Sequence, residues 1–187
     1  MFFTGPVDSG TVHNISYWLL QQAYADVKKV KLYISSTGGD MDSAFRLYDL
    51  MKSLSMEIET VGFGQVASAA VIIFLGGSKR TITDGCSFVL HGGIYNIGVP
   101  SAPIQAHKEA INRFNELYNK NISIIAKETQ KSEANVKKII EKATLFTSNE
   151  AKKFGLVHSV SKKLNIPIQT PTITQNMPLS PASLPTT

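Results

Sequence analysis

Residues 30–54 read VKLYISSTGGDMDSAFRLYDLMKSL, and this stretch decides the fold because three kinds of segment follow one another in it. Residues 30–34 alternate in polarity and are rich in β-forming types, which predicts a strand. Residues 35–40 are small or polar and include Gly38 and Gly39, which predicts a loop. Residues 44–54 carry apolar side chains at helical spacing. This order is typical of a parallel sheet built from βαβ units.

The same order of segments recurs on both sides of this stretch. Strands are predicted at residues 2–3, 58–61 and 87–91, with a strand-like pair at 156–157. Helices are predicted at residues 14–24 and 68–75, and between Thr147 and Gly155. Loops that contain glycine are predicted at residues 62–67 and 92–98. We therefore predict an α/β fold with right-handed crossovers.

One further helix is predicted to be long for a chain of this size. After Pro103, apolar side chains between residues 106 and 125 keep a period of about 3.6 residues. A small domain cannot cover every apolar side chain of such a helix, among them Ile111, Phe114 and Leu117. We therefore predict that the protein is an oligomer.

Length and composition predict one folded domain followed by a tail. The chain has 187 residues, of which 43% are hydrophobic and 18% charged, so it can bury a sizeable core. Residues 164–187 contain five of the eight prolines and no charged residue. We predict a domain over residues 1–163 and a disordered or extended tail over residues 164–187.

Several classes of protein are disfavoured by the same composition. The longest apolar run, residues 66–77, is too short to cross a bilayer, and no secretion signal is readable, so we predict a cytoplasmic protein. A single cysteine, Cys86, excludes an internal disulfide and a cysteine cluster for a metal, and we predict no cofactor. The net charge of +5 arises in residues 127–163, where nine lysines accompany four glutamates and no arginine. This pattern favours a solvated helical surface over a nucleic-acid site.

Three predicted strand ends carry residue types that acyl-transfer chemistry uses. Gly38 and Gly39 let backbone N–H groups approach a ligand, Ser68 begins a buried helix, and His91 ends a strand. Taken singly, these residues have simpler interpretations as a turn, an N-cap serine and a structural histidine. Together they predict a nucleophile, a base and an oxyanion hole.

The remaining reactive residue types have other interpretations. Cys86 precedes His91 by five residues, which places the two side chains on opposite faces of a strand and disfavours a Cys–His pair. Asp40 and Asp42 are predicted to cap the helix after the glycine loop. Surface or packing roles are predicted for the other histidines, which are His13, His107 and His158.

With these residues the sequence resembles the ClpP family of serine peptidases. The family's blocks occur in order at residues 2–7, 32–39, 64–69, 89–91 and 150–157. The resemblance implies the ββα spiral of the ClpP/crotonase fold, with the helix after Pro103 as its long handle. It implies that Ser68 is the nucleophile, that His91 is the general base, and that the backbone N–H groups of Gly39 and Ala69 form the oxyanion hole.

The resemblance also implies an assembly and partners. Subunits of the family form rings of seven that stack in pairs, so a heptamer or tetradecamer is expected, with peptides or unfolded proteins as substrates and no cofactor. A Clp ATPase is the implied partner. Met1, however, almost coincides with the first shared strand, which leaves no residues for the family's N-terminal axial loops.

The third member of the triad departs from the family's pattern. Alignment on Thr147 and Glu150 places Ala143 where the family has an aspartate. Thr144 and Glu141 are close in sequence, but neither can be assigned to His91. A ring subunit or scaffold with little or no activity is therefore an alternative to the serine endopeptidase.

Two further alternatives follow from the same motifs. The sequence Ala67-Ser68-Ala69-Ala70 also resembles ClpP-like phage head-maturation peptidases. A crotonase-like acyl-CoA enzyme would share the fold and the glycine loop, but such enzymes rely on N–H groups and acidic residues, so a Ser–His pair argues against it.

Overall fold

The computed structural model describes residues 1–93 and 103–166. The strands within these ranges are β1 (Phe2–Thr4), β2 (Lys29–Ser36), β3 (Glu57–Ala67), β4 (Lys79–Thr83), β5 (Ser87–Leu90), β6 (Thr144–Phe146) and β7 (Ser159–Ser161). The helices are α1 (Ser9–Tyr24), α2 (Met41–Ser53), α3 (Ala69–Leu75), α4 (Ile104–Thr129), α5 (Glu133–Glu141) and α6 (Ser148–Phe154). The predicted alternation of strands and helices is confirmed.

The sheet is parallel along most of its width. Its order is β1-β2-β3-β4-β7, and every neighbouring pair in this path is parallel. The second half of β3 leaves β4 and pairs with β5 instead, also in parallel. β6 then adds to β5 as an antiparallel strand. The ends of β3 and β5 therefore lie next to each other, and both carry residues of the predicted site.

Residues 62–67 were predicted to be a loop, and this prediction is wrong because β3 continues through them. Gly62 is packed, since a Cβ there would lie 2.9 Å from Ile82 and 3.2 Å from Val66. Gly64 has a φ of +61° close to a shift in the register between β2 and β3. Such glycines mark close packing and a bulge in a strand as often as they mark a turn.

Several other boundaries differ from the predicted ones. α1 begins at Ser9, earlier than predicted, because the Asp8 carboxylate accepts a 2.7 Å hydrogen bond from the Thr11 N–H and caps the helix. The last strand is β7 and not residues 156–157, which are buried outside any strand. No sequence pattern had predicted β4, α5 or β6. These elements are short and lack a clear period.

The capping predictions are confirmed for two helices and corrected for one residue. Asp40 caps α2 by accepting a 2.8 Å hydrogen bond from the Ser43 N–H. Asp42 does not cap; it lies in the first turn of α2 and forms an ion pair with Arg113 of α4. Thr147 and Glu150 form the reciprocal capping box of α6.

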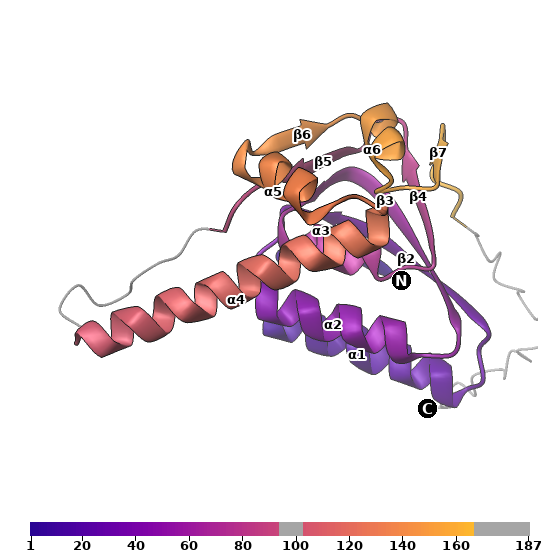
Figure 1. Cartoon of the computed structure of the whole chain (residues 1–187). Helices are drawn as coiled ribbons and strands as arrows, with labels where there is room; N and C mark the ends of the chain where they lie inside the picture. Colours follow the sequence, from indigo (N-terminus) through magenta and orange to yellow (C-terminus); the bar gives the residue numbers. More distant parts are fainter. Residues whose placement is uncertain (94–102, 167–187) are drawn as a thin grey trace, which may run out of the picture.

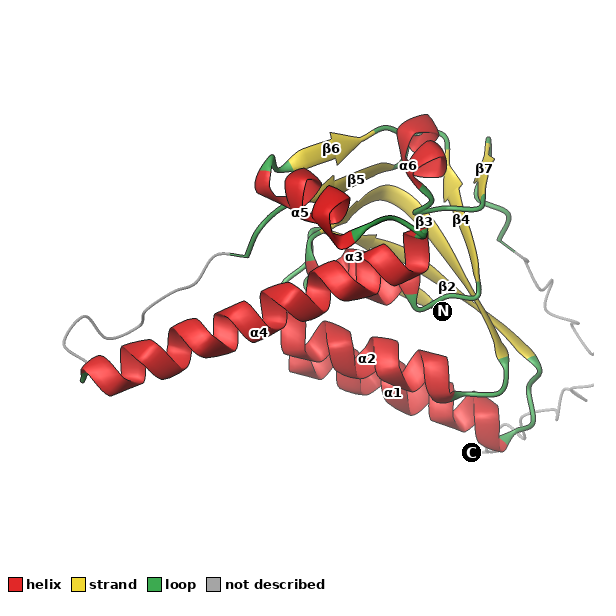
Figure 2. Cartoon of the chain, in the orientation of Figure 1, coloured by secondary structure: helices red, strands yellow, loops and turns green. Residues whose placement is uncertain are grey.

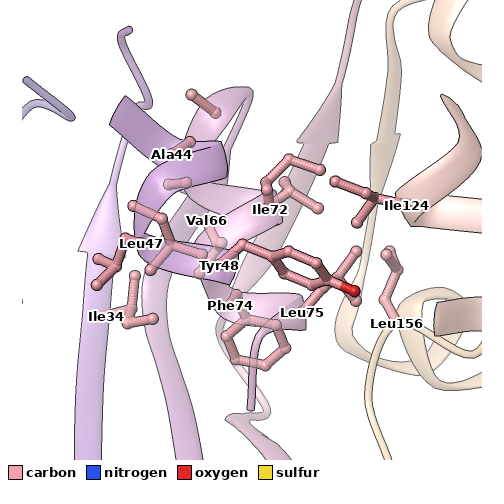
Figure 3. Close-up of a cluster of buried hydrophobic side chains, with 14 of the residues drawn as sticks. Ile34, Ala44, Leu47, Tyr48, Val66, Ile72, Phe74, Leu75, Ile124 and Leu156 are labelled. Atoms are coloured by element: carbon pink, nitrogen blue, oxygen red, sulfur yellow. The ribbon is translucent and has the colours of Figure 1, made fainter. Parts of the chain in front are cut away.

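The core lies between the sheet and the helices that pack on it. α1 and α2 run side by side, and α4 crosses near them (Figure 1). All residues of α3 are buried, because it lies between the sheet and the helices α2 and α4. Leu47 of α2, Val66 of β3 and Ile72 of α3 meet in this core (Figure 3). The core thus holds the helix that follows Ser68 in a fixed position.

α4 is the predicted long helix, with 26 residues. Its C-terminal part is packed, since Ile122, Ile124 and Ile125 are buried. Its N-terminal part extends beyond the rest of the described chain (Figure 2), and Ile104 and Ile111 are 75% and 51% exposed there. The handle-like helix expected after Pro103 is confirmed.

Parts of two predicted segments lie outside the described residues. These are residues 94–98 of the second glycine loop and residues 167–187 of the tail. The first tail residues contact the sheet, because the Tyr33 hydroxyl donates a 2.8 Å hydrogen bond to the Asn165 carbonyl oxygen. Within residues 1–93 and 103–166, no helix has the length and apolar character needed to span a bilayer.

Candidate active site

Ser68 occupies a sharp turn between β3 and α3. Its backbone has φ 53° and ψ −128°, a region that residues with a side chain rarely enter. The Ser68 N–H donates a 2.9 Å hydrogen bond to the Val89 carbonyl oxygen, and its own carbonyl accepts one of 3.0 Å from the Val71 N–H. Although Ser68 is at the N-cap position, its hydroxyl makes no capping hydrogen bond. The surrounding structure therefore holds a strained serine whose hydroxyl is not used by the helix.

The glycine loop packs directly against this turn. Gly38 has a φ of +95°, and a Cβ on it would lie 2.6 Å from the Ser68 Cβ and 2.7 Å from the Ala67 carbonyl oxygen. Gly39 has a φ of +150°, and a Cβ there would lie 2.2 Å from the Val7 carbonyl oxygen. Only residues without a side chain fit such close approaches of backbone to backbone.

The pairing of Gly39 with Val7 directs the Gly39 N–H away from Val7. In this parallel bridge Val7 bonds to the residues on either side of Gly39, donating to the Gly38 oxygen at 2.9 Å and accepting from the Asp40 N–H at 2.7 Å. The Gly39 N–H must then face the opposite side, because successive amides of an extended chain alternate in direction. Among the described residues, neither this N–H nor that of Ala69 has a hydrogen-bond acceptor. Both donors remain available to a ligand.

His91 follows β5 and is half-buried. Its Nδ1 lies 2.7 Å from the carbonyl oxygen of Gly92. A carbonyl oxygen only accepts hydrogen bonds, so this contact is a hydrogen bond when Nδ1 carries the proton. Within the described part of the chain, no hydrogen bond joins the Ser68 hydroxyl to His91, although both line one cavity.

Ala143, the position predicted for the third triad member, directly precedes β6, the strand that pairs with β5. β5 and β6 pair up to Leu90 opposite Thr144, and His91 and Ala143 are the residues that come next to this last pair, outside the two strands. Ala143 is exposed and has a φ of +51°. Its methyl group offers no hydrogen-bond acceptor.

The two neighbouring candidates for that role are engaged elsewhere. The Thr144 hydroxyl donates a 2.9 Å hydrogen bond to the Ile139 carbonyl oxygen. Glu141 lies on α5 and approaches Lys137 at 3.9 Å. Neither side chain has a hydrogen bond to His91 among the described residues.

Ser68, His91 and Gly39 share a cavity of about 470 Å³. Its other walls are mostly apolar and come from α2, α3, β5, α4 and α5; they include Met41, Val71, Leu90, Leu117, Ile125 and Ile140. Tyr118 and Asn121 add polar groups from α4. The sequence had predicted the apolar period of α4 but not that this helix forms a wall of the site, because the contact joins residues about fifty positions apart.

Among the described residues, Cys86 and the remaining histidines do not line this cavity. Cys86 is buried, and burial raises the pKa of its thiol to about 12, which leaves almost no thiolate at neutral pH. His158 accepts a 3.1 Å hydrogen bond from the Arg80 N–H, and burial, followed by the nearby Arg80 charge, lowers its pKa. His13 lies on the exposed surface of α1, and His107 is half-buried on α4.

Comparisons with known proteins agree with this geometry. A family model described as Clp protease matches residues 1–164. The chain is 30% identical over 146 residues to the ATP-dependent Clp protease proteolytic subunit 2 of Treponema denticola, an alignment that covers 77% of this chain and 72% of the relative. It is 31% identical over 144 residues to the protein of the same name from Borreliella burgdorferi, covering 76% and 71%.

A solved structure shares the fold. A ClpP1 mutant from Listeria monocytogenes superposes with a TM-score of 0.78 at 21% identity, covering 87% of this chain and 91% of that structure. The predicted ClpP/crotonase-like fold is thereby confirmed. From the sequence match over residues 1–164 and from the relatives, the chain belongs to the Clp protease family.

Proposed function

We propose that residues 1–163 form a serine endopeptidase domain that cleaves peptides or unfolded proteins through an acyl-enzyme on Ser68. The observation that carries this proposal is the strained backbone of Ser68. The Ser68 hydroxyl makes no capping hydrogen bond to α3, and Ser68 lines one cavity with His91 and Gly39. Strain at a functional residue persists where the surrounding structure enforces it. Here β5 and α3 form hydrogen bonds with the Ser68 backbone, and the glycine loop packs closely against Ser68.

The residues of the site take complementary roles in this reaction. The Ser68 Oγ attacks the carbonyl carbon of the peptide bond while the His91 Nε2 accepts the hydroxyl proton. The N–H groups of Gly39 and Ala69 stabilise the negative charge on the carbonyl oxygen. His91 then returns the proton to the leaving amine, and water hydrolyses the ester in a second cycle of the same steps.

The apolar cavity walls favour substrates with a nonpolar side chain next to the scissile bond. Met41, Val71, Leu117 and Ile125 can surround such a side chain, and its burial would contribute about 25 cal/mol per Å² of apolar surface. A charged side chain among these apolar groups would lose hydration, and the two charged residues that also line the cavity, Asp40 and Arg113, are engaged with Ser43 and Asp42.

The proposal extends to assembly and partners by family resemblance. We propose rings of seven subunits, stacked in pairs through α4, and delivery of unfolded chains by a Clp ATPase. The support for the ring contact is the projecting apolar part of α4.

A second candidate function is a ring subunit without activity of its own. Two observations favour it, namely the methyl group of Ala143 in place of a carboxylate and the missing hydrogen bond between Ser68 and His91. Catalytic hydrogen bonds are often long before substrate binds, so the second observation alone does not decide between the two functions.

Labelling with a fluorophosphonate distinguishes an active serine peptidase from an inactive ring subunit. We expect the probe to modify Ser68 in the assembled protein and to fail with Ser68→Ala, while the exposed-serine control Ser55→Ala labels like the original protein. Hydrolysis of a fluorogenic peptide should be lost in parallel. A protein that assembles but neither labels nor cleaves would instead be the inactive subunit.

A further inference from the structure

We propose that the main-chain carbonyl of Gly92 positions the His91 imidazole, in place of the missing carboxylate. The proposal rests on the proposed function for its catalytic meaning. The tautomer that it assigns, with the proton on Nδ1, is a property of the resting protein and can be measured without activity.

The first support is the contact itself. The His91 Nδ1 and the Gly92 oxygen are 2.7 Å apart in a partly buried environment, which is short for a neutral N–H···O hydrogen bond. Since the oxygen can only accept, the bond holds the proton on Nδ1 and leaves the lone pair of Nε2 free to accept the serine proton. This is the tautomer that a general base of a serine triad requires.

The second support is the absence of a competing acceptor among the described neighbours. Ala143 adjoins the last pair of the β5–β6 ladder, Leu90 and Thr144, and carries only a methyl group. Thr144 donates to Ile139, and Glu141 is paired with Lys137 on the surface of α5. Among the described residues, the Gly92 oxygen is the hydrogen-bond partner of the imidazole.

A carbonyl cannot replace every property of a carboxylate. It fixes the tautomer and the ring orientation, but as a neutral dipole it stabilises the positive imidazolium less than a negative charge would. Loss of the carboxylate from a serine triad lowers kcat by about 10⁴, mainly through the wrong tautomer. Because Gly92 already holds the tautomer, the site should keep the part of the rate that depends on the correct tautomer. It should lack only the stabilisation of the imidazolium by a negative carboxylate.

Nitrogen-15 NMR of the assembled protein labelled in its histidines tests the tautomer directly. The His91 signals are identified by their loss in His91→Gln. At a pH where the ring is neutral, we expect the Nδ1–H tautomer of His91, and the same tautomer in Gly92→Ala, since a Cβ at residue 92 meets no atom within 4 Å. An Nε2–H tautomer, or a mixture of both, would overturn the proposal.

A matched pair of substitutions at residue 143 tests the positioning role kinetically. The φ of +51° suits asparagine and aspartate, which tolerate the left-handed region better than alanine. If Gly92 already orients the ring, Ala143→Asn adds nothing and kcat stays within about threefold. Ala143→Asp adds the missing charge and should raise kcat by about 10- to 10³-fold. A tenfold or larger gain with Ala143→Asn would show that the ring is unoriented in the original protein and would contradict the proposal.

The experiments distinguish failure of the proposed peptidase function from failure of the positioning role of Gly92. If the proposed peptidase function is wrong, fluorophosphonate labelling and peptide cleavage are absent in the original protein and in all variants, while the NMR result still reports the tautomer. If only the positioning role is wrong, fluorophosphonate labelling still occurs. In that case His91 shows the Nε2–H tautomer or a mixture, or Ala143→Asn raises kcat tenfold or more.

Discussion

At the scale of single residues, the site depends on backbone conformations that most side chains avoid. Ser68 and Gly38 both have positive φ values, and each approaches the other within van der Waals contact. A non-glycine residue in such a region raises the free energy by about 1–3 kcal/mol, so the surrounding contacts must hold it. Gly38 is the contact that a single methyl group would break.

Gly38→Ala should therefore lower both stability and activity. The new Cβ would need to lie within 3 Å of the Ser68 Cβ and the Ala67 oxygen, at a φ of +95°. We expect a loss of about 2–4 kcal/mol in the free energy of unfolding, measured by urea denaturation, together with loss of fluorophosphonate labelling. Gly85→Ala is the control, because a Cβ at residue 85 has no neighbour within 4 Å. Equal unfolding midpoints for the two variants would show that the close packing of the glycine loop is not enforced.

At the scale of elements, a partly buried polar cluster joins the C-terminal part of α4 to the domain. The Glu128 carboxylate accepts a 2.7 Å hydrogen bond from the Tyr48 hydroxyl and forms ion pairs with Lys52 at 2.8 Å and Arg80 at 3.1 Å. Arg80 is itself buried, and its guanidinium donates hydrogen bonds to two carbonyl oxygens. These belong to Gly155, the C-cap residue of α6, and to Leu156, which follows it. One carboxylate thus links α2, α4 and β4.

The charge of Glu128 is favoured in the folded protein. Burial opposes ionisation more than any other single cause, but hydrogen bonds from Lys52 and Tyr48 and the charges of Lys52 and Arg80 together outweigh it. The pKa of Glu128 is consequently below its ordinary value of 4.5. The stabilising contribution is therefore complete above pH 4.5 and is lost as the pH falls through the lowered pKa.

Glu128→Gln should destabilise the protein near neutral pH and much less in acid. Removing one partner from a buried ion pair costs about 3–5 kcal/mol, and the amide keeps part of the hydrogen bonding, so we expect a loss of about 2–4 kcal/mol at pH 7. The difference from the original protein should shrink as urea denaturation is repeated from pH 6 down to pH 3. Glu116→Gln, in an exposed pair on the same helix, should change stability by less than about 1 kcal/mol. A difference that stays constant with pH would contradict the role given to the Glu128 charge.

At the scale of the whole molecule, the N-terminal part of α4 is the feature that a single subunit does not explain. It projects past the domain, and it exposes Ile104 and Ile111 to solvent. An isolated exposed isoleucine is ordinary, but a projecting helix with an apolar stripe is typical of an interface. Tyr118, seven residues after Ile111 and therefore on the same side of α4, lines the cavity, so the proposed interface and the candidate site lie along one helix face.

We expect the protein to sediment at micromolar concentration as a multiple of its 20.4 kDa chain. Ile111→Lys should shift it toward smaller species, because a charge would be buried in the interface. Asn112→Lys, at an exposed position of the same helix about 100° around its axis from Ile111, is the matched control and should leave the sedimentation profile unchanged. A 20.4 kDa species for the original protein would refute the prediction.

The sequence by itself determined the features that depend on local pattern. Alternation and helical period predicted the strand–loop–helix units and the long helix, and Thr147 with Glu150 predicted a capping box, because these signals act within a few residues. The motif around Ser68, His91 and the glycine loop was also readable as a set. In the structure, Gly39, Ser68 and His91 line one cavity.

Only the tertiary structure decided the features that depend on distant partners. The glycines of residues 62–67 predict a loop, but these residues belong to a strand. Gly62 packs against Ile82, and the segment pairs with β2 and β5. The hydroxyl of Ser68 looks like an N-cap until its backbone conformation shows that it is not used as one. The acceptor for His91 was unreadable because a main-chain carbonyl has no sequence signature. In each case the deciding feature is a backbone conformation or a contact to the backbone that follows from packing, and local sequence alone does not specify packing.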